Sequence, residues 1–334
     1  MARSPRKTKT EPGATSSLLN ALKFISLVQA DEGQVYETHC ILSNKAATAF
    51  NGVLAAGQII EEDINICPHT LKLSAALARC GETLSITQLD NFRLSIKSEN
   101  FKAVIACANP MGMTYAQPDA PTITINDNLK KGFDIVSVLV SDNSEHVVTA
   151  SILLKANSMY STNRHVMFEY WHGIDMPDEF AIPKAALIAV SKSGKTLEKM
   201  GYSDRTVTFW FTDGSWLRTQ KYNDKWPNVN SILNINAHPQ PIPINLFKGI
   251  NAIKPFAEAS SKIFINEGQL ATETLDNAGA TYDIEGLPAG ITVSYKYMQL
   301  IEAHALSIDF DVEKQKRYLY FCGENIRGVI MGMV

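Results

Sequence analysis

The sequence lacks the long apolar runs and the cysteine patterns that mark membrane, secreted and zinc-binding proteins. No stretch approaches the roughly 20 apolar residues that span a bilayer, and the basic residues Arg3 to Lys9 are followed by Glu11-Pro12-Gly13, not by a signal-peptide core. The five cysteines are an odd number without a Cys-x-x-Cys pair, which argues against disulfide frameworks and zinc knuckles. We therefore expect a cytoplasmic protein with buried, inert thiols.

The sequence also lacks an excess of charge of either sign. Its 31 Lys and Arg residues are set against 34 Asp and Glu, a net charge of -3, so bulk charge does not attract polyanions and any nucleic-acid site is local. Residues 1–14 are predicted to form a basic flexible tail. With 334 residues, 45% of them hydrophobic, the chain is expected to fold into two or three globular domains.

Complete catalytic motifs are missing. Ser193-Gly194-Lys195-Thr196 ends like a phosphate-binding P-loop, but Ala189 stands where that motif needs glycine, and a predicted helix precedes it instead of a strand. Gly194 is better explained as the chain reversal after that helix. The seven histidines are scattered singly and form no metalloprotease or triad pattern. The sequence therefore predicts no enzyme, no metal site and no cofactor.

An internal repeat is the strongest positive signal. A helix predicted over 67–79 precedes strands at 84–88 and 92–96. The same order returns with a helix over 182–190 and strands at 206–211 and 215–219, which flank an Asp-Gly turn. Pro68 and Pro183 are 115 residues apart (183 − 68), which predicts a third copy near residue 297. There a helix is predicted over 295–303, with strands at 306–310 and 318–321.

Each third of the chain also begins with an amphipathic helix followed by a strand. The helices are predicted at 18–27, 129–140 and 246–259, and the strands at 36–42, 147–154 and 263–270. Proline-rich segments at 118–121 and 238–243 are typical of linkers. We therefore predict an α+β fold with three tandem domains at 15–118, 119–236 and 237–334, each with two helices packed on antiparallel sheets.

Four stretches then carry a resemblance to a known family. They are Thr162-Asn163-Arg164-His165-Val166, Phe180-Ala181-Ile182-Pro183-Lys184, Trp226-Pro227-Asn228-Val229-Asn230-Ser231-Ile232-Leu233 and Val329-Ile330-Met331-Gly332-Met333-Val334. In register with the three repeats, they resemble the bacterial-type DNA polymerase sliding clamp, the β subunit of DNA polymerase III. The sequence diverges from the family pattern, and such divergence is compatible with a clamp encoded by a phage. Asn163-Arg164 replaces Asp-Gly, Gly332 replaces proline and the Arg-Leu ending is missing.

The resemblance implies a processivity factor without catalytic activity. Two subunits would close head to tail into a six-domain ring that encircles double-stranded DNA without sequence specificity, inside a bacterial or infected cell. The subunit interface would lie between the strand around 101–107 and the region after Ala259. Twelve helices would line the hole and contact phosphates. The expected DNA-binding residues are Lys23, Lys72, Arg79, Lys130, Lys131, Lys184, Lys192, Lys195, Lys248, Lys254 and Lys296. An ordinary solvated helix face is the competing explanation for each of them.

The resemblance also implies an apolar cleft where DNA polymerase and clamp loader dock short peptides. The expected cleft residues are Thr162, Asn163, Val166, Pro227, Ser231, Ile232, Val329, Met331, Gly332 and Met333. A C-terminal strand that merely completes the last sheet would explain the final residues equally well. For the whole protein, the alternative is a β-rich virion structural or assembly protein, which has no need of basic helices in every repeat.

Overall fold

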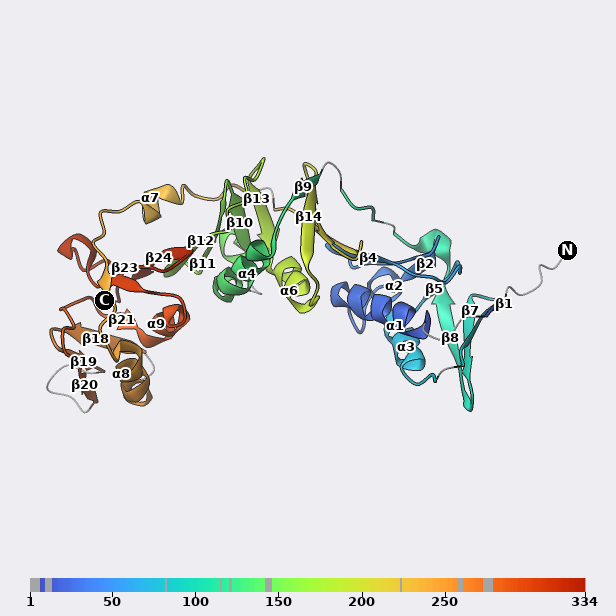
Figure 1. Ribbon diagram of the computed structural model, residues 1–334, viewed down its shortest axis with the longest axis horizontal. Coiled ribbons are helices and arrows are strands. Elements are labelled where there is room, and N and C mark those ends of the chain that lie inside the picture. The colour runs from blue at the N-terminus through green and yellow to red at the C-terminus, as the bar shows by residue number, and fades with distance from the viewer. Residues whose placement is uncertain are drawn as a thin grey trace. The chain divides into compact units, whose positions relative to one another are not determined.

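The computed structural model describes residues 7–9, 14–81, 83–114, 116–119, 122–141, 146–222, 224–257, 261–272 and 279–333. The chain forms two compact units (Figure 1). Unit 1 comprises residues 1–130 and 185–221, and unit 2 comprises residues 131–184 and 222–334. Each unit therefore combines one outer repeat with part of the middle repeat. None of the described helices is long and apolar enough to cross a membrane.

The described residues of unit 1 form two antiparallel sheets. The larger has seven strands in the order β2-β3-β4-β16-β15-β14-β9, and its repeats meet where Leu217 of β16 pairs with Ala56 of β4. The smaller has five strands in the order β1-β6-β7-β8-β5. The bounds are β1 Lys7–Lys9, β2 Ile41–Ser43, β3 Ala46–Phe50, β4 Leu54–Ile59, β5 Cys67–Pro68, β6 Ser85–Leu89, β7 Arg93–Ser98, β8 Phe101–Ala108, β9 Thr122–Thr124, β14 Leu197–Tyr202, β15 Thr206–Phe211 and β16 Trp216–Gln220.

The helices of unit 1 bury their apolar faces on these sheets. Helix α1 (Ala14–Ile25) packs on β3, β4 and helix α3 (Thr70–Leu77). Its Phe24 meets Phe211 of β15 edge to face, with ring centroids 5.6 Å apart. Since Phe24 comes from the first repeat and Phe211 from the second, this contact joins the two repeats within one core. Short helices follow at η1 Ser26–Val28, α2 Val35–Thr38 and η2 Pro110–Gly112.

Unit 2, in the part of the chain that the structure describes, also forms two antiparallel sheets. The larger has eight strands in the order β13-β10-β11-β12-β24-β23-β22-β17, and the middle and last repeats meet where Met167 of β12 pairs with Val329 of β24. The smaller has the order β20-β19-β18-β21. The bounds are β10 Ser151–Lys155, β11 Ser158–Thr162, β12 Val166–Trp171, β13 Phe180–Pro183, β17 Gln240–Pro241, β18 Lys262–Asn266, β19 Gln269–Ala271, β20 Thr281–Asp283, β21 Val293–Ser294, β22 Ser307–Asp309, β23 Tyr318–Cys322 and β24 Ile326–Met331.

Helices cover one face of the eight-stranded sheet. At Gly132 of α4 (Asp127–Val136), an added Cβ would lie 2.6 Å from both Met159 and Tyr170, so only glycine permits this close approach. Helices α8 (Leu246–Ile253) and α9 (Tyr295–Ile301) pack against each other in the last repeat. The remaining helices are η3 Ser137–Leu139, α5 Val147–Ala150, α6 Lys184–Lys192, α7 Asn230–Leu233, η4 Lys254–Phe256 and η5 Val312–Lys314. Both α4 and α6 begin in one unit and end in the other.

Most predicted elements are confirmed, including the third repeat at α9, β22 and β23. The predicted strands 36–42 and 147–154 are wrong at their starts, where α2 and α5 each add one helical turn. In α2 the Gln34 amide donates to the Glu37 carboxylate at 2.6 Å, a local bond that apolar periodicity does not reveal. Ile182-Pro183 belongs to β13 instead of the following helix, and 263–270 is a hairpin of β18 and β19.

Within the predicted tail, Lys7–Lys9 pair with β6 as strand β1, and residues 1–6 and 10–13 lie outside the described residues. The predicted linker at 238–243 contributes the two-residue strand β17, which pairs with β22. Part of the other predicted linker, residues 120–121, also lies outside the described residues. The three predicted domain boundaries remain predictions.

Candidate functional site

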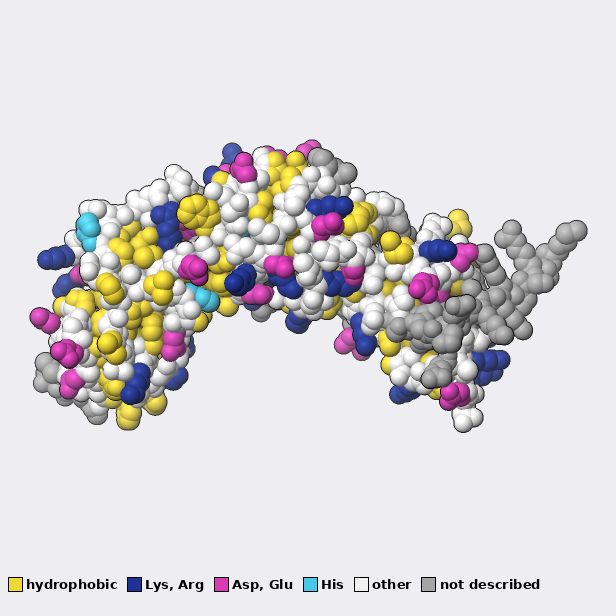
Figure 2. All heavy atoms as spheres, viewed as in Figure 1, with side chains coloured by type: hydrophobic (Ala, Val, Ile, Leu, Met, Phe, Trp, Pro, Cys, Tyr) yellow, Lys and Arg dark blue, Asp and Glu magenta, His cyan; other side chains and the backbone are white. Residues whose placement is uncertain are grey.

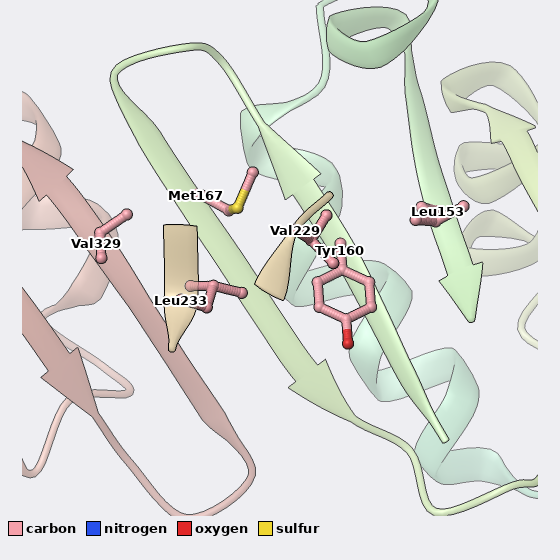
Figure 3. Packing of buried hydrophobic residues seen from close by; sticks show 6 residues of the cluster. All are labelled: Leu153, Tyr160, Met167, Val229, Leu233 and Val329. Carbon is pink, nitrogen blue, oxygen red and sulfur yellow. The ribbon is translucent and has the colours of Figure 1, made fainter. Parts of the chain in front are cut away.

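The first candidate site is the face of the eight-stranded sheet in unit 2 that points away from the helices. Side chains alternate along each strand. Phe168 packs on Phe321, with ring centroids 5.4 Å apart, on the helix side. Met167 and Val329 therefore point to the opposite face, where they belong to one buried cluster (Figure 3). This face carries an apolar surface on the side of the sheet opposite helix α4.

The segment of residues 226–239, here called the covering segment, packs on this face. Val229 and Leu233 of the segment are buried in the cluster together with Leu153, Tyr160, Met167 and Val329. Figure 3 shows these six side chains coming from α7 with its preceding turn and from strands β10, β11, β12 and β24. Trp226, Ile232 and Ile235 add partly buried apolar surface. The segment thus forms one wall of an apolar site whose floor is the sheet.

A polar row crosses the same face next to the cluster. Glu169 accepts a hydrogen bond of 2.9 Å from the Tyr160 hydroxyl and forms an ion pair with Arg327. Arg327 also donates to Asn234 of the covering segment at 3.2 Å. Burial, reinforced by the bond to Glu169, raises the pKa of Tyr160 to about 12, so the hydroxyl stays a donor. This network ties the covering segment to the sheet.

The predicted cleft residues divide into three groups. Val329 and Ile232 belong to or pack against the cluster, whereas Pro227 and Ser231 are exposed on the covering segment. The prediction for Val166 is off by one position, because strand alternation turns the Val166 side chain to the helix side of the sheet and puts its neighbour Met167 on the cleft face. Sequence reasoning also missed Leu153, Tyr160, Val229 and Leu233, although the alternation of β10 and β11 offered a signal for the first two.

The other predicted cleft residues form hydrogen bonds that involve main-chain atoms. Asn163 accepts bonds from the amides of His165 and Val166, at 3.0 and 2.8 Å, and so shapes the turn between β11 and β12, where the Thr162 hydroxyl also donates to a main-chain oxygen. The amides of Met331, Gly332 and Met333 donate to His165, Arg317 and Thr292, each at 2.8 Å. These bonds hold residues 331–333 to the segments that precede β12, β23 and β21, and of the three only Met331 belongs to a strand of the sheet. Met331 nevertheless remains 39% exposed on the same strand face as Val329.

Two cavities continue from the cluster along this face. One, of about 470 Å³, is lined by residues of β11, β12 and the β23–β24 hairpin, and the other, of about 640 Å³, by residues 233–239 of the covering segment. They share Tyr320, Cys322 and Arg327. The corresponding face in unit 1 holds Trp216, Ala55 and Ala116, and the cavity recorded beside this cluster, against Phe50 and Ala116, has about 10 Å³. In unit 1 the tryptophans Trp210 and Trp216 pack at this position.

The second candidate site is the set of basic helix surfaces. Among the described helices of at least seven residues, five contain lysine and no acidic residue: α1, α3, α6, α8 and α9. Only α4 mixes its two lysines with two aspartates, and Figure 2 shows basic and acidic side chains interspersed around α4 and α6. The predicted residues that are exposed are Lys23, Lys72, Arg79, Lys131, Lys192, Lys248 and Lys296. Lys130, Lys184, Lys195 and Lys254 are partly buried.

Many solved structures match the chain, and three of them illustrate the similarity. The DNA polymerase III subunit beta of Pseudomonas aeruginosa has a TM-score of 0.79 at 10% identity, and the match covers 99% of this chain and 100% of that chain. The DNA polymerase sliding clamps of Bacillus subtilis and Caulobacter crescentus reach TM-scores of 0.82 and 0.81, both at 12% identity, with 99% of this chain and 100% of theirs covered. This chain has the β sliding-clamp fold.

The predicted fold class is therefore confirmed, and the clamp relationship is visible in structure at low sequence identity. Neither the family models nor the curated proteins match the sequence. The three repeats predicted from periodicity therefore correspond to the clamp fold, although the matched structures share only 10% to 12% sequence identity with this chain.

Within the clamp fold, the P-loop-like tetrad has a structural role. The Lys195 ammonium donates to Asp213 at 2.6 Å, to Gln58 at 2.9 Å and to Ser215 at 3.0 Å, and it lies 4.2 Å from the centre of the Phe24 ring. Gly194 has φ +66°, the left-handed conformation expected for a reversal after helix α6. Since its donors are already used, Lys195 is poorly placed to hold a phosphate.

The clamp fold shows no sign of metal chemistry in its described residues. No group of three or more His, Cys, Asp or Glu side chains there is arranged to hold a metal ion. Burial raises the pKa of Cys40 to about 12 and that of Cys67 to about 11, so these thiols are inert, as predicted. Cys80, Cys107 and Cys322 differ from the prediction because they are only partly buried.

Proposed function

We propose that the protein is a DNA polymerase processivity factor, a sliding clamp that encircles duplex DNA and tethers the replicative polymerase. The observation that carries the proposal is the clamp fold combined with acid-free lysine helices in all three repeats. A clamp makes and breaks no bond, so no catalytic residue, metal or cofactor is assigned. The protein acts in DNA replication in the cytoplasm. The matched structures come from bacteria, so a phage source remains a prediction.

The helices contact DNA through its phosphates. Lysines spread over several helices neutralise phosphates without reading base edges, and such contacts permit sliding. The seven exposed cations named above are assigned this role first, and Lys130, Lys184 and Lys254 are assigned secondary contacts. Lys195 is left out because its ammonium already has three partners. The three repeats, 15–118, 119–236 and 237–334, act as the three clamp domains of each subunit.

Ring closure uses a free strand edge. On the side of β8 away from β7, strand β5 pairs only with Cys107 and Ala108, so residues 101–106 have no strand partner among the described residues. Val104 of this edge is 49% exposed. Phe256, which precedes the region after Ala259 predicted to form the other side of the interface, is 57% exposed. An open edge with exposed apolar side chains needs a partner to be covered. We assign it to a head-to-tail homodimer.

Polymerase and clamp loader dock on the apolar site of unit 2. Its methionines, Met167 and Met331, suit a surface that accepts several peptides, because the thioether side chain adapts its packing. The open cavities beside the cluster supply space for the rest of a bound peptide.

Retention on DNA tests the clamp function. The protein is loaded onto nicked circular DNA by a bacterial clamp loader and separated from free protein by gel filtration before and after the circle is linearised. A clamp stays on the circle and slides off the linear form. We expect K72E/R79E to weaken retention and to lower the slope of log K against log salt by about two. Reversal of Lys45 and Lys314, which are exposed outside the long helices, is the matched control.

Two results would contradict the proposal: equal retention on circular and linear DNA, or equal retention of the two double variants. Light scattering provides an independent check on the ring. A dimer has a mass of 2 × 36.8 kDa, or 73.6 kDa, and K72E/R79E should keep it. Large open assemblies would instead favour a virion structural protein.

A further inference from the structure

We propose that the groove beside the apolar cleft binds a basic residue, Lys or Arg, of the peptide docked in that cleft. The inference rests on the proposed docking function and assigns a second contact to the same partner. The groove is the 470 Å³ cavity on the outer face of the eight-stranded sheet. Its lining includes Ser158, Glu169, Tyr320 and Trp171 together with the hairpin residues Glu324 and Asn325.

Strand register places this groove directly beside the apolar cluster, because the row next to the cluster, Glu169 with Arg327, already lines the groove. Met167 pairs with Val329 within the cluster, Glu169 pairs with Arg327 one row further, and Trp171 pairs with Ser158 beyond that. Alternate residues of a strand lie about 7 Å apart. An extended peptide whose apolar side chain enters the cluster therefore reaches the groove within a few residues.

The charges in the groove favour a cation. Glu169 is already held by Tyr160 and Arg327, so this acid and this base compensate each other. Glu324 is exposed and forms no ion pair with any described residue. The charged residues that line the groove, Glu169, Glu324 and Arg327, thus leave a net charge of −1. A carboxylate with no compensating base attracts an ammonium or guanidinium group.

An aromatic wall adds to this preference. Trp171 is 57% exposed although it stands at the end of a strand whose other residues are buried or nearly so. An indole face attracts a cation within about 6 Å of its centre more strongly than the other aromatic rings do. Tryptophan and a neighbouring carboxylate together form a site for the end of a lysine or arginine side chain, whose apolar stem covers the ring.

The groove is continuous with the proposed docking cleft. The second cavity shares Tyr320, Cys322 and Arg327 with the groove, and it is also lined by Leu233 of the cluster. Tyr320 itself packs against the cluster. The occupant to which we commit is therefore a short extended peptide of a protein partner, with an apolar anchor in the cluster and a Lys or Arg in the groove.

Peptide binding to the intact protein tests the assignment. The probes are fluorescein-labelled octapeptides with a central Leu-Phe pair and alanine elsewhere, and a series in which one lysine replaces each alanine in turn. Binding is measured by fluorescence anisotropy at low salt. We expect at least one lysine position to improve affinity about fivefold over the parent peptide, which corresponds to a cation–π contact near a carboxylate. Lysines at the other positions should have little effect.

The variants W171A and E324Q should each remove most of this gain while the parent peptide binds as before. Y222A and E313Q are the matched controls, because Tyr222 and Glu313 are exposed in the same unit outside the groove. Replacing the favourable lysine by norleucine should abolish the gain.

The outcomes separate the two proposals. If the parent peptide binds and no lysine improves its affinity, or if W171A and E324Q keep the full gain, the basic-residue site is wrong and the cleft stands. If no peptide binds, both the cleft and the groove assignments fail. If lysine improves affinity equally in V329D, whose apolar site is disrupted, the cation binds elsewhere and the groove is again refuted.

Discussion

Replacing Lys195 with methionine should destabilise unit 1, although the sequence suggests a phosphate or DNA contact for this residue. Its ammonium joins Asp213 and Ser215, which follow β15, to Gln58 of β4, and its side chain is only 20% exposed. Gln58 is 137 residues away in the chain. Lys195 therefore cross-links the first and second repeats within one core.

The expected loss of stability follows from the hydrogen-bonding groups that remain when the Lys195 ammonium is removed. A hydrogen bond to a charged group contributes about 1.5–3 kcal/mol, but Asp213 is 45% exposed and water replaces part of the lost interaction. We therefore expect K195M to lower the free energy of unfolding of unit 1 by about 2 kcal/mol. For a unit of this size, the thermal midpoint should fall by roughly 4 to 8 °C. Methionine keeps the apolar stem beside Phe24, so the loss reports on the ammonium.

Thermal unfolding followed by amide exchange in β15 and β16 measures this effect. K192M is the control, since Lys192 is exposed at the end of helix α6, three residues before Lys195. Burial by itself raises the pKa of Asp213, but the bonds from Lys195 and Ser215 outweigh it and hold the pKa below 3.8. The pair therefore stabilises the fold above that pH, and the difference between K195M and wild type should shrink as the pH falls further. Equal midpoints for K195M and K192M would refute this reasoning, most clearly if K195M also lost DNA retention.

Two further predictions concern buried titratable groups. Glu62 is 3% exposed, and neither carboxylate oxygen has a hydrogen-bond partner among the described residues. Burial raises its pKa above 4.5, so E62Q should stabilise unit 1 by about 1–3 kcal/mol at pH 7, and chemical denaturation should show this gain disappearing below pH 4.5. An unchanged or lower stability at pH 7 would mean that the carboxylate has a partner. Burial lowers the pKa of His172 from 6.5 to about 4, so unit 2 should lose up to about 3 kcal/mol as the pH falls from 6.5 to 4. Denaturation of H172Q across this range should give a flatter pH profile, and an identical profile would count against the assignment.

Local patterns in the sequence determine the repeats and most of their elements. Apolar residues at helical spacing and alternating strands around Asp213-Gly214 are visible within about ten residues of each other. The recurrence of helix and hairpin is equally local, so three tandem α+β domains can be predicted without knowing any contact between distant residues. The single helical turns α2 and α5 escape such a prediction because four residues carry no periodicity.

Only the tertiary structure decided which residues form the sites. Alternation has a period of two, so a shift of one residue exchanges the two faces of a strand, and the prediction chose Val166 where Met167 faces the cleft. Lys195 has the sequence pattern of a free cation, whereas the fold places Gln58 and Asp213 around its ammonium. The groove at Trp171 likewise needs the hairpin at Glu324, about 150 positions along the chain. Contacts between residues so far apart depend on how the sheets pair, which no local pattern in a single sequence specifies.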